Sequence, residues 1–367
     1  MYDNGTSTMS RAATSVRVAG VGRENCHCVP RVCRQTANFA PQTIFPTNPM
    51  KKTPLAALLA LAATLVLLAA CGGAKKSNPN WIHEDDVRLA VDETFQPIVQ
   101  NMVETFGMQH PEATMLPTYV SEDSAIRMLV RDSVRLIIAT RPLTDDERKV
   151  VEAHSLGVKT NLIATDAIAL VVNKSVADTL ITLDEVKGIV TGRITRWEQL
   201  GKHVQTGELS LVFDHSGSST VRYMRDSLCG GRPLAGNVYA SDSGTNRSVL
   251  QMVERNPHII GVVGCNWLKG DADGVLNNFS NLPVTVMRVA RSTESIHPYV
   301  RPYQYYIATA DYPLLRSVYI INTDPRSSSM LRNFYFFVKG QKGQTIICNN
   351  SQLLPITPVQ VKSVSVK

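Results

Sequence analysis

Three short segments of the chain combine hydroxyl side chains with the expected start of a helix. They lie at residues 92–95, 121–124 and 214–220, and each follows an apolar run that is typical of a strand. A helix start leaves several backbone N–H groups without a partner. These N–H groups can donate to an oxyanion, and hydroxyls beside them can donate as well. A fourth segment contributes Thr140 and Arg141, whose forked guanidinium can bond two oxygens of a carboxylate or phosphate. The chemistry that these segments predict is anion binding.

Ordinary helix capping would also explain each of these segments taken alone. The loop of Ser216, Gly217, Ser218 and Ser219 is the most specific of them, because it holds more small and hydroxyl-bearing residues than a cap requires. The occurrence of four such segments in one chain favours a binding site over capping.

Catalysis is a weaker interpretation of the same serines. A nucleophile at Ser216 or Ser218 would need a base, and the side chain of His215 leaves the backbone in a different direction from that of its neighbour. The chain has no Gly-x-Ser-x-Gly elbow, and no Cys-x-x-Cys or His-x-x-x-His follows Cys71. We therefore expect no catalytic residue, no metal and no cofactor.

Strand and helix patterns alternate from Val87 onward, which is typical of an α/β fold with mostly parallel sheets. In such sheets ligands lie beyond the carboxyl ends of the strands, where the four segments are expected. The predicted strands are residues 87–91, 115–120, 136–140, 162–173, 209–213, 259–264, 303–308 and 318–322.

The N-terminal part of the chain resembles a lipoprotein leader. Met50 is followed by two lysines and then by an apolar run from Leu55 to Ala70, which is short for a membrane span. The order Leu-Ala-Ala-Cys that ends at Cys71 resembles the bacterial lipobox, in which the cysteine is acylated and becomes the first mature residue. We expect a signal peptide at 50–71, lipidation at Cys71 and a tether at 72–86; a transmembrane anchor is the alternative.

Residues 1–49 have little apolar pattern, and we interpret them as a mis-assigned or disordered extension. The net charge of +7 also comes mainly from this end of the chain. Residues 1–71 hold seven basic and two acidic residues, which leaves +2 for the remainder. With no basic run interleaved with aromatic residues, the sequence does not favour a nucleic-acid partner.

The order of four motifs resembles the phosphate-binding proteins of high-affinity phosphate ABC transporters. The motifs are Thr94-Phe95, Ala-Thr-Arg-Pro-Leu at 139–143, the 216–219 loop, and Asn-Pro-His-Ile-Ile-Gly at 256–261. The resemblance implies a two-lobed periplasmic-binding-protein-like fold of type II, in which each lobe is a mostly parallel sheet flanked by helices. A two-strand hinge would join a first lobe of residues 87–166 and 318–367 to a second lobe of residues 167–317.

The resemblance also implies which residues hold the ligand. Thr94 and Phe95 match the family's Thr-Phe pair, whose hydroxyl and amide bind phosphate oxygens. Ser216, Gly217, Ser218 and Ser219 match the family's Ser-Gly-Thr-Ser loop. The family's serine at the second helix start falls near Ser121 or Glu122.

Two positions depart from the family. Thr140, with Arg141 beside it, stands where the family places an aspartate that accepts the proton of hydrogen phosphate. Val212 stands where the family places an arginine, so the guanidinium is expected from Arg141 or Arg222. Without the aspartate, discrimination between phosphate and sulfate should weaken.

These observations predict a lipid-anchored solute-binding protein of the cell envelope that faces the periplasm or the exterior. It would capture a small oxyanion, with inorganic phosphate favoured, for the permease of an ABC importer. We expect a monomer that performs no chemistry on its ligand. Two alternatives are another anion, such as sulfate or a phosphorylated or carboxylated metabolite, and a surface lipoprotein that uses the same fold for sensing or adhesion.

Overall fold

The computed structural model describes residues 85–201, 205–241, 244–268, 279–293 and 298–358. The predictions for the 1–49 extension, the signal peptide, Cys71 and the tether up to residue 84 therefore lie outside the described residues. By its internal contacts, Asn78–Lys367 forms one compact unit. Within the described ranges no helix is both long and apolar enough to cross a membrane.

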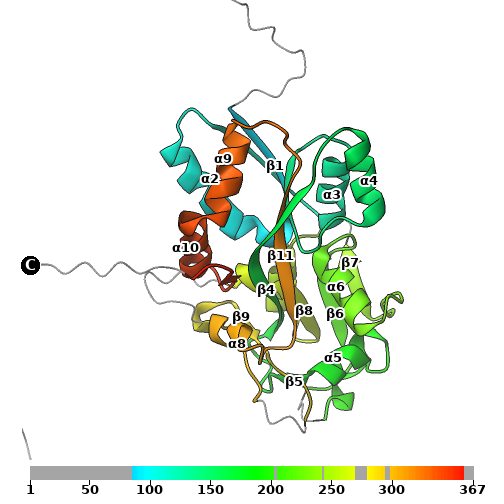
Figure 1. Cartoon of the computed structure of the whole chain (residues 1–367). Coiled ribbons are helices and arrows are strands. Elements are labelled where there is room, and N and C mark those ends of the chain that lie inside the picture. Colours follow the sequence, from blue (N-terminus) through cyan, green and yellow to red (C-terminus); the bar gives the residue numbers. More distant parts are fainter. Residues whose placement is uncertain (1–84, 202–204, 242–243, 269–278, 294–297, 359–367) are drawn as a thin grey trace, which may run out of the picture. The chain divides into compact units, whose positions relative to one another are not determined.

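A ten-stranded sheet runs through this unit in the order β2-β1-β3-β11-β4-β8-β6-β7, and β9 and β12 pair with β4 beside that path (Figure 1). A separate parallel pair consists of β5 (Leu180–Thr182) and β10 (Arg288–Ala290). The strands of the main sheet are β1 (Asp86–Asp92), β2 (Thr114–Val120), β3 (Leu136–Ala139), β4 (Lys159–Asn173), β6 (Ser210–His215), β7 (Val238–Ser241), β8 (Ile259–Gly264), β9 (Val284–Val286), β11 (Leu315–Asn322) and β12 (Leu354–Pro355).

The sheet has two parallel halves that meet at β4. Strands β2, β1 and β3 run parallel in one half, and β8, β6 and β7 run parallel in the other. On β4, residues 159–167 pair antiparallel with β11, whereas residues 168–171 pair antiparallel with β8. We call the part built on β1, β2, β3 and β11 the first lobe and the part built on β6, β7, β8 and β9 the second lobe.

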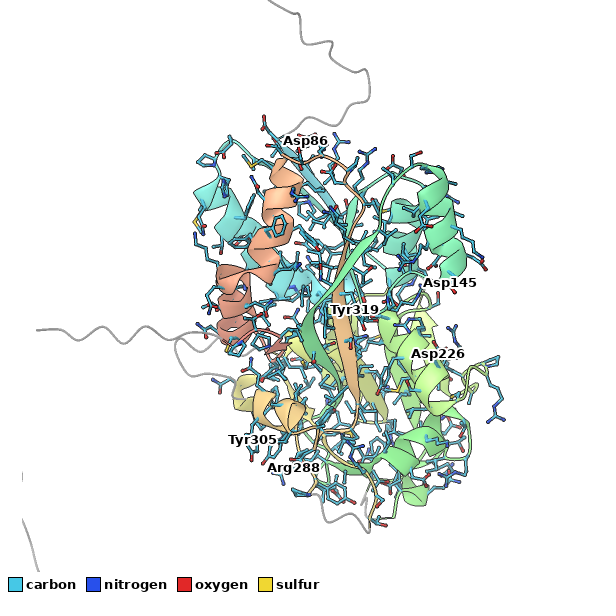
Figure 2. The ribbon with its side chains drawn as sticks, viewed as in Figure 1. Asp86, Asp145, Asp226, Arg288, Tyr305 and Tyr319 are labelled. Carbon is cyan, nitrogen blue, oxygen red and sulfur yellow. The ribbon has the colours of Figure 1, made fainter. Side chains whose placement is uncertain are left out.

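Helices flank both halves of the sheet (Figure 1). Figure 2 shows Asp86 and the pair Arg288 and Tyr305 at opposite ends of this unit. The helices of the first lobe are α2 (Gln96–Gln109), α3 (Glu122–Val130), α4 (Asp145–Ala153), α9 (Met330–Lys339) and α10 (Gln341–Asn350); those of the second lobe are α5 (Leu183–Val190), α6 (Ser219–Leu228), α7 (Asn246–Arg255) and α8 (Gln304–Ala308). Short 3₁₀ turns occur at η1 (Glu93–Phe95), η2 (Trp197–Gln199), η3 (Cys265–Trp267) and η4 (Phe279–Asn281).

The core follows from this layering. The middle of β4 is buried residue after residue, as expected for a strand covered on both faces. In the first lobe, the apolar stripe of α2 places Phe106 against Phe334 and Phe337 of α9, with ring centroids 5.2 and 5.4 Å away. These contacts fix α2, and therefore the turn η1 that precedes it.

The strand predicted at residues 303–308 is wrong, because Gln304–Ala308 forms the helix α8. The side-chain nitrogen Nε2 of Gln304 lies 2.9 Å from each of three backbone carbonyl oxygens to which it donates, those of Cys348, Ser351 and Leu353. The helix also buries Ile307 while Tyr305 stays 68% exposed. Tertiary contacts therefore override the strand preference of this tyrosine-rich segment.

The α2–α9 contact makes a stability prediction. Replacing Phe106→Ala should lower the free energy of unfolding by about 3–5 kcal/mol, because a fully buried ring is lost and a cavity remains. Met108→Ala on the same helix is the control, since Met108 is 76% exposed and its loss should cost less than about 0.5 kcal/mol. Urea unfolding of both variants checks this, and equal losses would show that the packing is described wrongly.

Candidate anion-binding site

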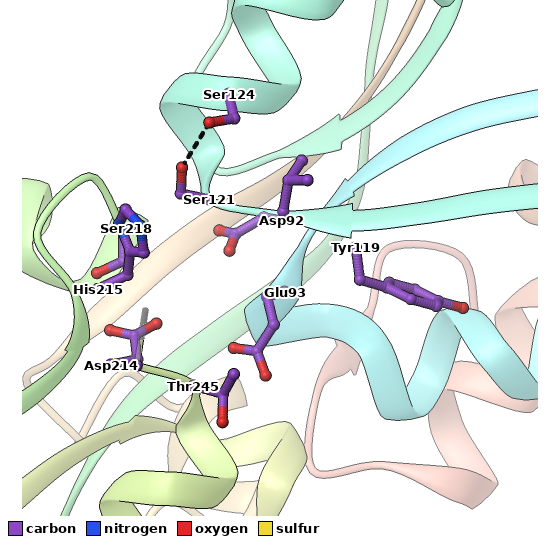
Figure 3. Close-up of a pocket in the computed structure, with 11 residues that line it drawn as sticks. Asp92, Glu93, Tyr119, Ser121, Ser124, Asp214, His215, Ser218 and Thr245 are labelled. Carbon is purple, nitrogen blue, oxygen red and sulfur yellow. Dashed lines mark hydrogen bonds between the residues drawn. The ribbon is translucent and has the colours of Figure 1, made fainter. Parts of the chain in front are cut away.

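A pocket of about 250 Å³ lies between the two lobes. It is formed where strands β1, β2 and β6 end and where α3, α6 and α7 begin (Figure 3). Because both parallel halves of the sheet direct their carboxyl ends to this place, loops of the two lobes meet there. The residues that line it are Asp92, Glu93, Tyr119, Val120, Ser121 and Ser124 from the first lobe and Asp214, His215, Ser218, Gly244 and Thr245 from the second.

Three helix starts contribute hydroxyls to the pocket wall. Ser121, the N-cap residue of α3, donates to the hydroxyl of Ser124 at 3.0 Å and makes no side-chain cap bond. Ser218 caps α6, and its Oγ accepts the backbone N–H of Val221 at 3.3 Å. Thr245 caps α7 in a capping box. The predicted residues Ser121 and Ser218 therefore face the same pocket.

Thr94 and Phe95 lie buried beside the pocket, in the turn η1 between β1 and α2. The N–H of Thr94 donates to Oδ1 of Asp92 at 3.1 Å, and Thr94 Oγ1 has no hydrogen-bond partner among the described residues. A Cβ added at Gly264 of the second lobe would lie 2.2 Å from Thr94 Cγ2. Only glycine permits this close approach of the two lobes.

Arg316 was not predicted as a site residue. It lies on β11 and is only 6% exposed, with Nε donating to Asp166 Oδ2 and Nη1 donating to Ser219 Oγ, both at 2.8 Å. Its Nη2 is buried without a hydrogen-bond partner in the described part of the chain. A Cβ added at Gly264 would lie 3.3 Å from this nitrogen. Arg316 Nη2 and the side chain of Thr94 therefore both lie next to Gly264.

The sequence carries a signal for this pair. Asp166 is a charged residue within the apolar run of β4. Arg316 lies just before the strand predicted at residues 318–322. Charged residues are rarely fully buried unless they are paired, so opposite charges in two buried strands indicate a pair.

Thr140 and Arg222 belong to a network around Glu122. Glu122 is fully buried, and its Oε1 accepts the backbone N–H and the hydroxyl of Thr140 at 2.6 and 2.7 Å. Its Oε2 accepts Nε of Arg222 from the second lobe at 2.6 Å, and Arg222 Nη2 donates to Thr140 Oγ1 at 2.7 Å. Burial alone would raise the pKa of Glu122, but Arg222 and Thr140 outweigh it and hold the pKa below its usual range. The network connects the two lobes next to the pocket.

The remaining predicted residues are placed differently. Arg141 donates from both terminal nitrogens to Glu147, at 2.7 and 2.8 Å, and it is not among the residues that line the pocket. Ser216 is exposed, and Gly217 approaches the start of α3, where its carbonyl accepts the N–H of Asp123 at 3.4 Å. Ser219 lies behind the pocket wall on Arg316.

Comparisons with known proteins identify the family of the chain. A family model described as a PBP superfamily domain matches residues 74–340. The chain belongs to the PBP superfamily. The phosphate-binding protein PstS of Bacillus subtilis is 24% identical over 320 residues, which cover 85% of this chain and 97% of that protein. PstS of Staphylococcus haemolyticus is 24% identical over 231 residues, covering 61% of this chain and 71% of that protein.

Solved structures show the same fold. One, from Clostridium perfringens, is assigned as a phosphate ABC transporter substrate-binding protein and contains bound phosphate; it has a TM-score of 0.60 and 20% identity, and covers 74% of this chain and 100% of that chain. An ABC-type phosphate transport receptor from Vibrio cholerae has a TM-score of 0.53 and 22% identity with the same coverage. The predicted family and the predicted periplasmic-binding-protein fold are confirmed, while the two-strand hinge and the lobe boundaries stay predictions.

This PBP-superfamily pocket is rich in carboxylates. Figure 3 shows Asp92 and Glu93 extending from the first lobe toward Asp214 and Thr245 of the second lobe, while Tyr119 points away. Burial, followed by the nearby charge of Glu122, raises the pKa of Asp92 to about 7. Burial also raises the pKa of Glu93, although Asn246 donates to it. Asp92 Oδ2 and Glu93 Oε1 have no hydrogen-bond partner among the described residues.

The raised pKa of Asp92 gives stability a pH dependence. Its usual pKa is 3.8, so between about pH 4 and pH 7 the folded chain holds a proton that the unfolded chain releases. The stability that Asp92 contributes is therefore present below pH 3.8 and is lost as the pH rises through 7, by up to about 1.4 kcal/mol per pH unit. In Asp92→Asn this loss should disappear.

Urea unfolding of the full-length chain at about pH 5 and about pH 8 measures this difference. The control is Asp145→Asn, which removes an exposed carboxylate at the start of α4 and should retain the loss of stability that is assigned to Asp92. Equal pH dependence in Asp92→Asn and the wild type would contradict the assignment.

Proposed function

We propose that this chain is a solute-binding protein that captures inorganic phosphate between its two lobes and delivers it to the permease of an ABC importer. The observation that carries the proposal is a group of buried polar atoms at or beside the pocket that have no hydrogen-bond partner among the described residues: Thr94 Oγ1, Arg316 Nη2 and Asp92 Oδ2. Buried polar groups are nearly always hydrogen-bonded, so such a group marks a place where a polar ligand completes the bonding. The two donors, on Thr94 and Arg316, and the acceptor, on Asp92, lie in the same part of the structure.

The mixture of donors and acceptors selects the ligand. Arg316, the hydroxyl of Thr94 and the N–H groups at the starts of α3 and α6 suit negatively charged oxygens. A carboxylate oxygen repels such an oxygen unless a proton lies between them. Hydrogen phosphate carries that proton and sulfate does not. Asp92 therefore accepts the proton of hydrogen phosphate, which is the role of the family aspartate whose position is occupied here by Thr140.

Two features of the relatives support delivery to a transporter. The curated relatives are named phosphate-binding proteins, and the Vibrio cholerae structure is named a receptor of ABC-type phosphate transport. The family is one of binding domains, and in this proposal the ligand undergoes no reaction. The permease and ATPase are therefore the partners of this chain.

The anchor is the finer part of the proposal. The leader at residues 50–71 directs the chain out of the cytoplasm, and an acylated Cys71 holds the mature protein on the outer face of a membrane. Acyl chains contribute about 0.8 kcal/mol per buried methylene, so two or more chains hold a protein firmly on a bilayer.

Calorimetric titration of the full-length chain tests the ligand. Phosphate should bind at about pH 8, and sulfate should bind at least about tenfold more weakly. Arg316→Lys keeps the charge but loses the fork between Asp166 and Ser219, so phosphate affinity should fall about tenfold or more.

Arg193→Lys is the matched control, because Arg193 is an exposed arginine that pairs with the nearby Asp184 and is not among the residues that line the pocket. Urea unfolding of both variants separates lost affinity from lost stability. If Arg316→Lys remains folded and binds phosphate as the wild type does, Arg316 is not part of the site. If sulfate binds as tightly as phosphate, the role given to Asp92 is wrong.

Labelling with a radioactive fatty acid in a bacterial host tests the anchor. The wild type and Cys348→Ser should incorporate the label, whereas Cys71→Ser should not, because it lacks the thiol that is acylated. Equal labelling of Cys71→Ser and the wild type would show that Cys71 is not the acylated residue. The proposed phosphate site would not be affected by that result.

A further inference from the structure

A second concave surface lies on the first lobe, apart from the pocket between the lobes. It has a volume of about 510 Å³ and is formed between the beginning of β4 and one side of α9, which Figure 1 labels. We call it the β4–α9 groove and define it by Lys159, Thr160 and Asn161 of β4 and Arg332, Phe336 and Lys339 of α9. None of these residues has a part in phosphate capture.

The charge of the β4–α9 groove has one sign. Among the described residues that line it are Lys159, Arg332 and Lys339, and none of those residues is an aspartate or glutamate. In the described part of the chain, none of the three forms a salt bridge; Lys339 Nζ donates to the neutral oxygen Asn161 Oδ1 at 2.9 Å. Three cations without acidic partners attract an anionic partner.

Aromatic rings hold two of these cations in place. The guanidinium of Arg332 lies 5.0 Å from the ring centroid of Phe336, and Lys339 Nζ lies 4.7 Å from that of Tyr335. Such cation–π contacts limit the freedom of long side chains. Phe336 itself stays 49% exposed, so it offers an apolar contact between the charges.

The floor of the groove is an open sheet edge. Residues 159–162 of β4 pair with β11 on one side, and among the described strands no partner lies on the other side, because β12 reaches only Ala164 and Thr165. An unpaired edge presents backbone N–H and C=O groups to another strand. Thr160 Oγ1 is also buried there without a hydrogen-bond partner among the described residues.

We propose that the β4–α9 groove binds an acidic, extended segment of a partner protein, which adds a strand to the free edge of β4. The backbone of the segment pairs with residues 159–162, and its carboxylates meet Lys159, Arg332 and Lys339. A second copy of this chain is disfavoured because the same cations would face each other. A flat bilayer is disfavoured because the surface is hollowed rather than protruding.

Fluorescence anisotropy with the full-length chain tests the proposal. The probe is a labelled peptide that alternates glutamate and valine, which should bind and should dissociate as salt is added. The same peptide with lysine in place of glutamate should not bind. A third version, N-methylated at alternate amides, keeps its charge but cannot pair with a strand edge, and it should bind at least about tenfold more weakly.

Charge-reversing variants locate the site. Arg332→Glu with Lys339→Glu should weaken binding of the glutamate peptide at least about tenfold and leave phosphate titration unchanged. Lys187→Glu with Arg193→Glu, both exposed on or beside α5, makes the same charge change elsewhere and should leave both titrations unchanged.

Three outcomes would overturn the proposal. In the first, the N-methylated peptide binds as well as its parent, which would mean that no strand is added. In the second, vesicles containing phosphatidylglycerol bind through Arg332 and Lys339 while the glutamate peptide does not, which would assign the groove to a membrane. In the third, the double reversal on α9 has no effect on peptide binding.

Discussion

The buried pair of Arg316 and Asp166 is the interaction on which the site depends. It lies on β11 and β4, the two antiparallel strands at the centre of the sheet, where β4 changes its neighbour from β11 to β8. Two charges removed from water are costly unless each is bonded on several sides. Here Ser219 accepts a hydrogen bond from the guanidinium and the ring of Phe95 lies beside it, while Nη2 has no partner among the described residues. The helix starts of both lobes are thus arranged around one fixed cation.

The balance of charge around this pair shows how a pocket with several carboxylates is compatible with the proposed anionic ligand. Asp92 and Asp214 are buried, and Glu122 is neutralised by Arg222 from the other lobe. The hydroxyls of Thr140 and Thr220 satisfy oxygens of Glu122 and Asp214 at 2.7 and 2.6 Å. Among the described residues near the pocket, the buried atoms without a hydrogen-bond partner include Arg316 Nη2, Thr94 Oγ1, Asp92 Oδ2 and Glu93 Oε1.

The sequence predicted the fold well because local patterns decide it. Apolar runs in β3 and β8 and the amphipathic stripe of α2 are visible in single segments. The N-cap positions of Ser121 and Ser218 could be predicted because N-caps have a local signature, while their part in ligand binding stays a prediction. Arg316 and Glu122 have no such local signature, because their partners lie 150 and 100 positions away in the chain. For Arg316 the sequence offers only a weaker signal, which is an opposite charge in another buried strand. Arg141 shows the converse, since a sequence neighbour, Glu147, binds it.

The bond from Arg222 to Glu122 has a kinetic consequence. Because the two residues belong to different lobes, any widening of the pocket stretches this bond and brings water to a carboxylate that is otherwise fully enclosed. If the proposed phosphate ligand leaves by separation of the lobes, breaking this bond is part of the barrier to its release. In the proposed function, the residence time of phosphate therefore depends on a contact that does not touch the ligand.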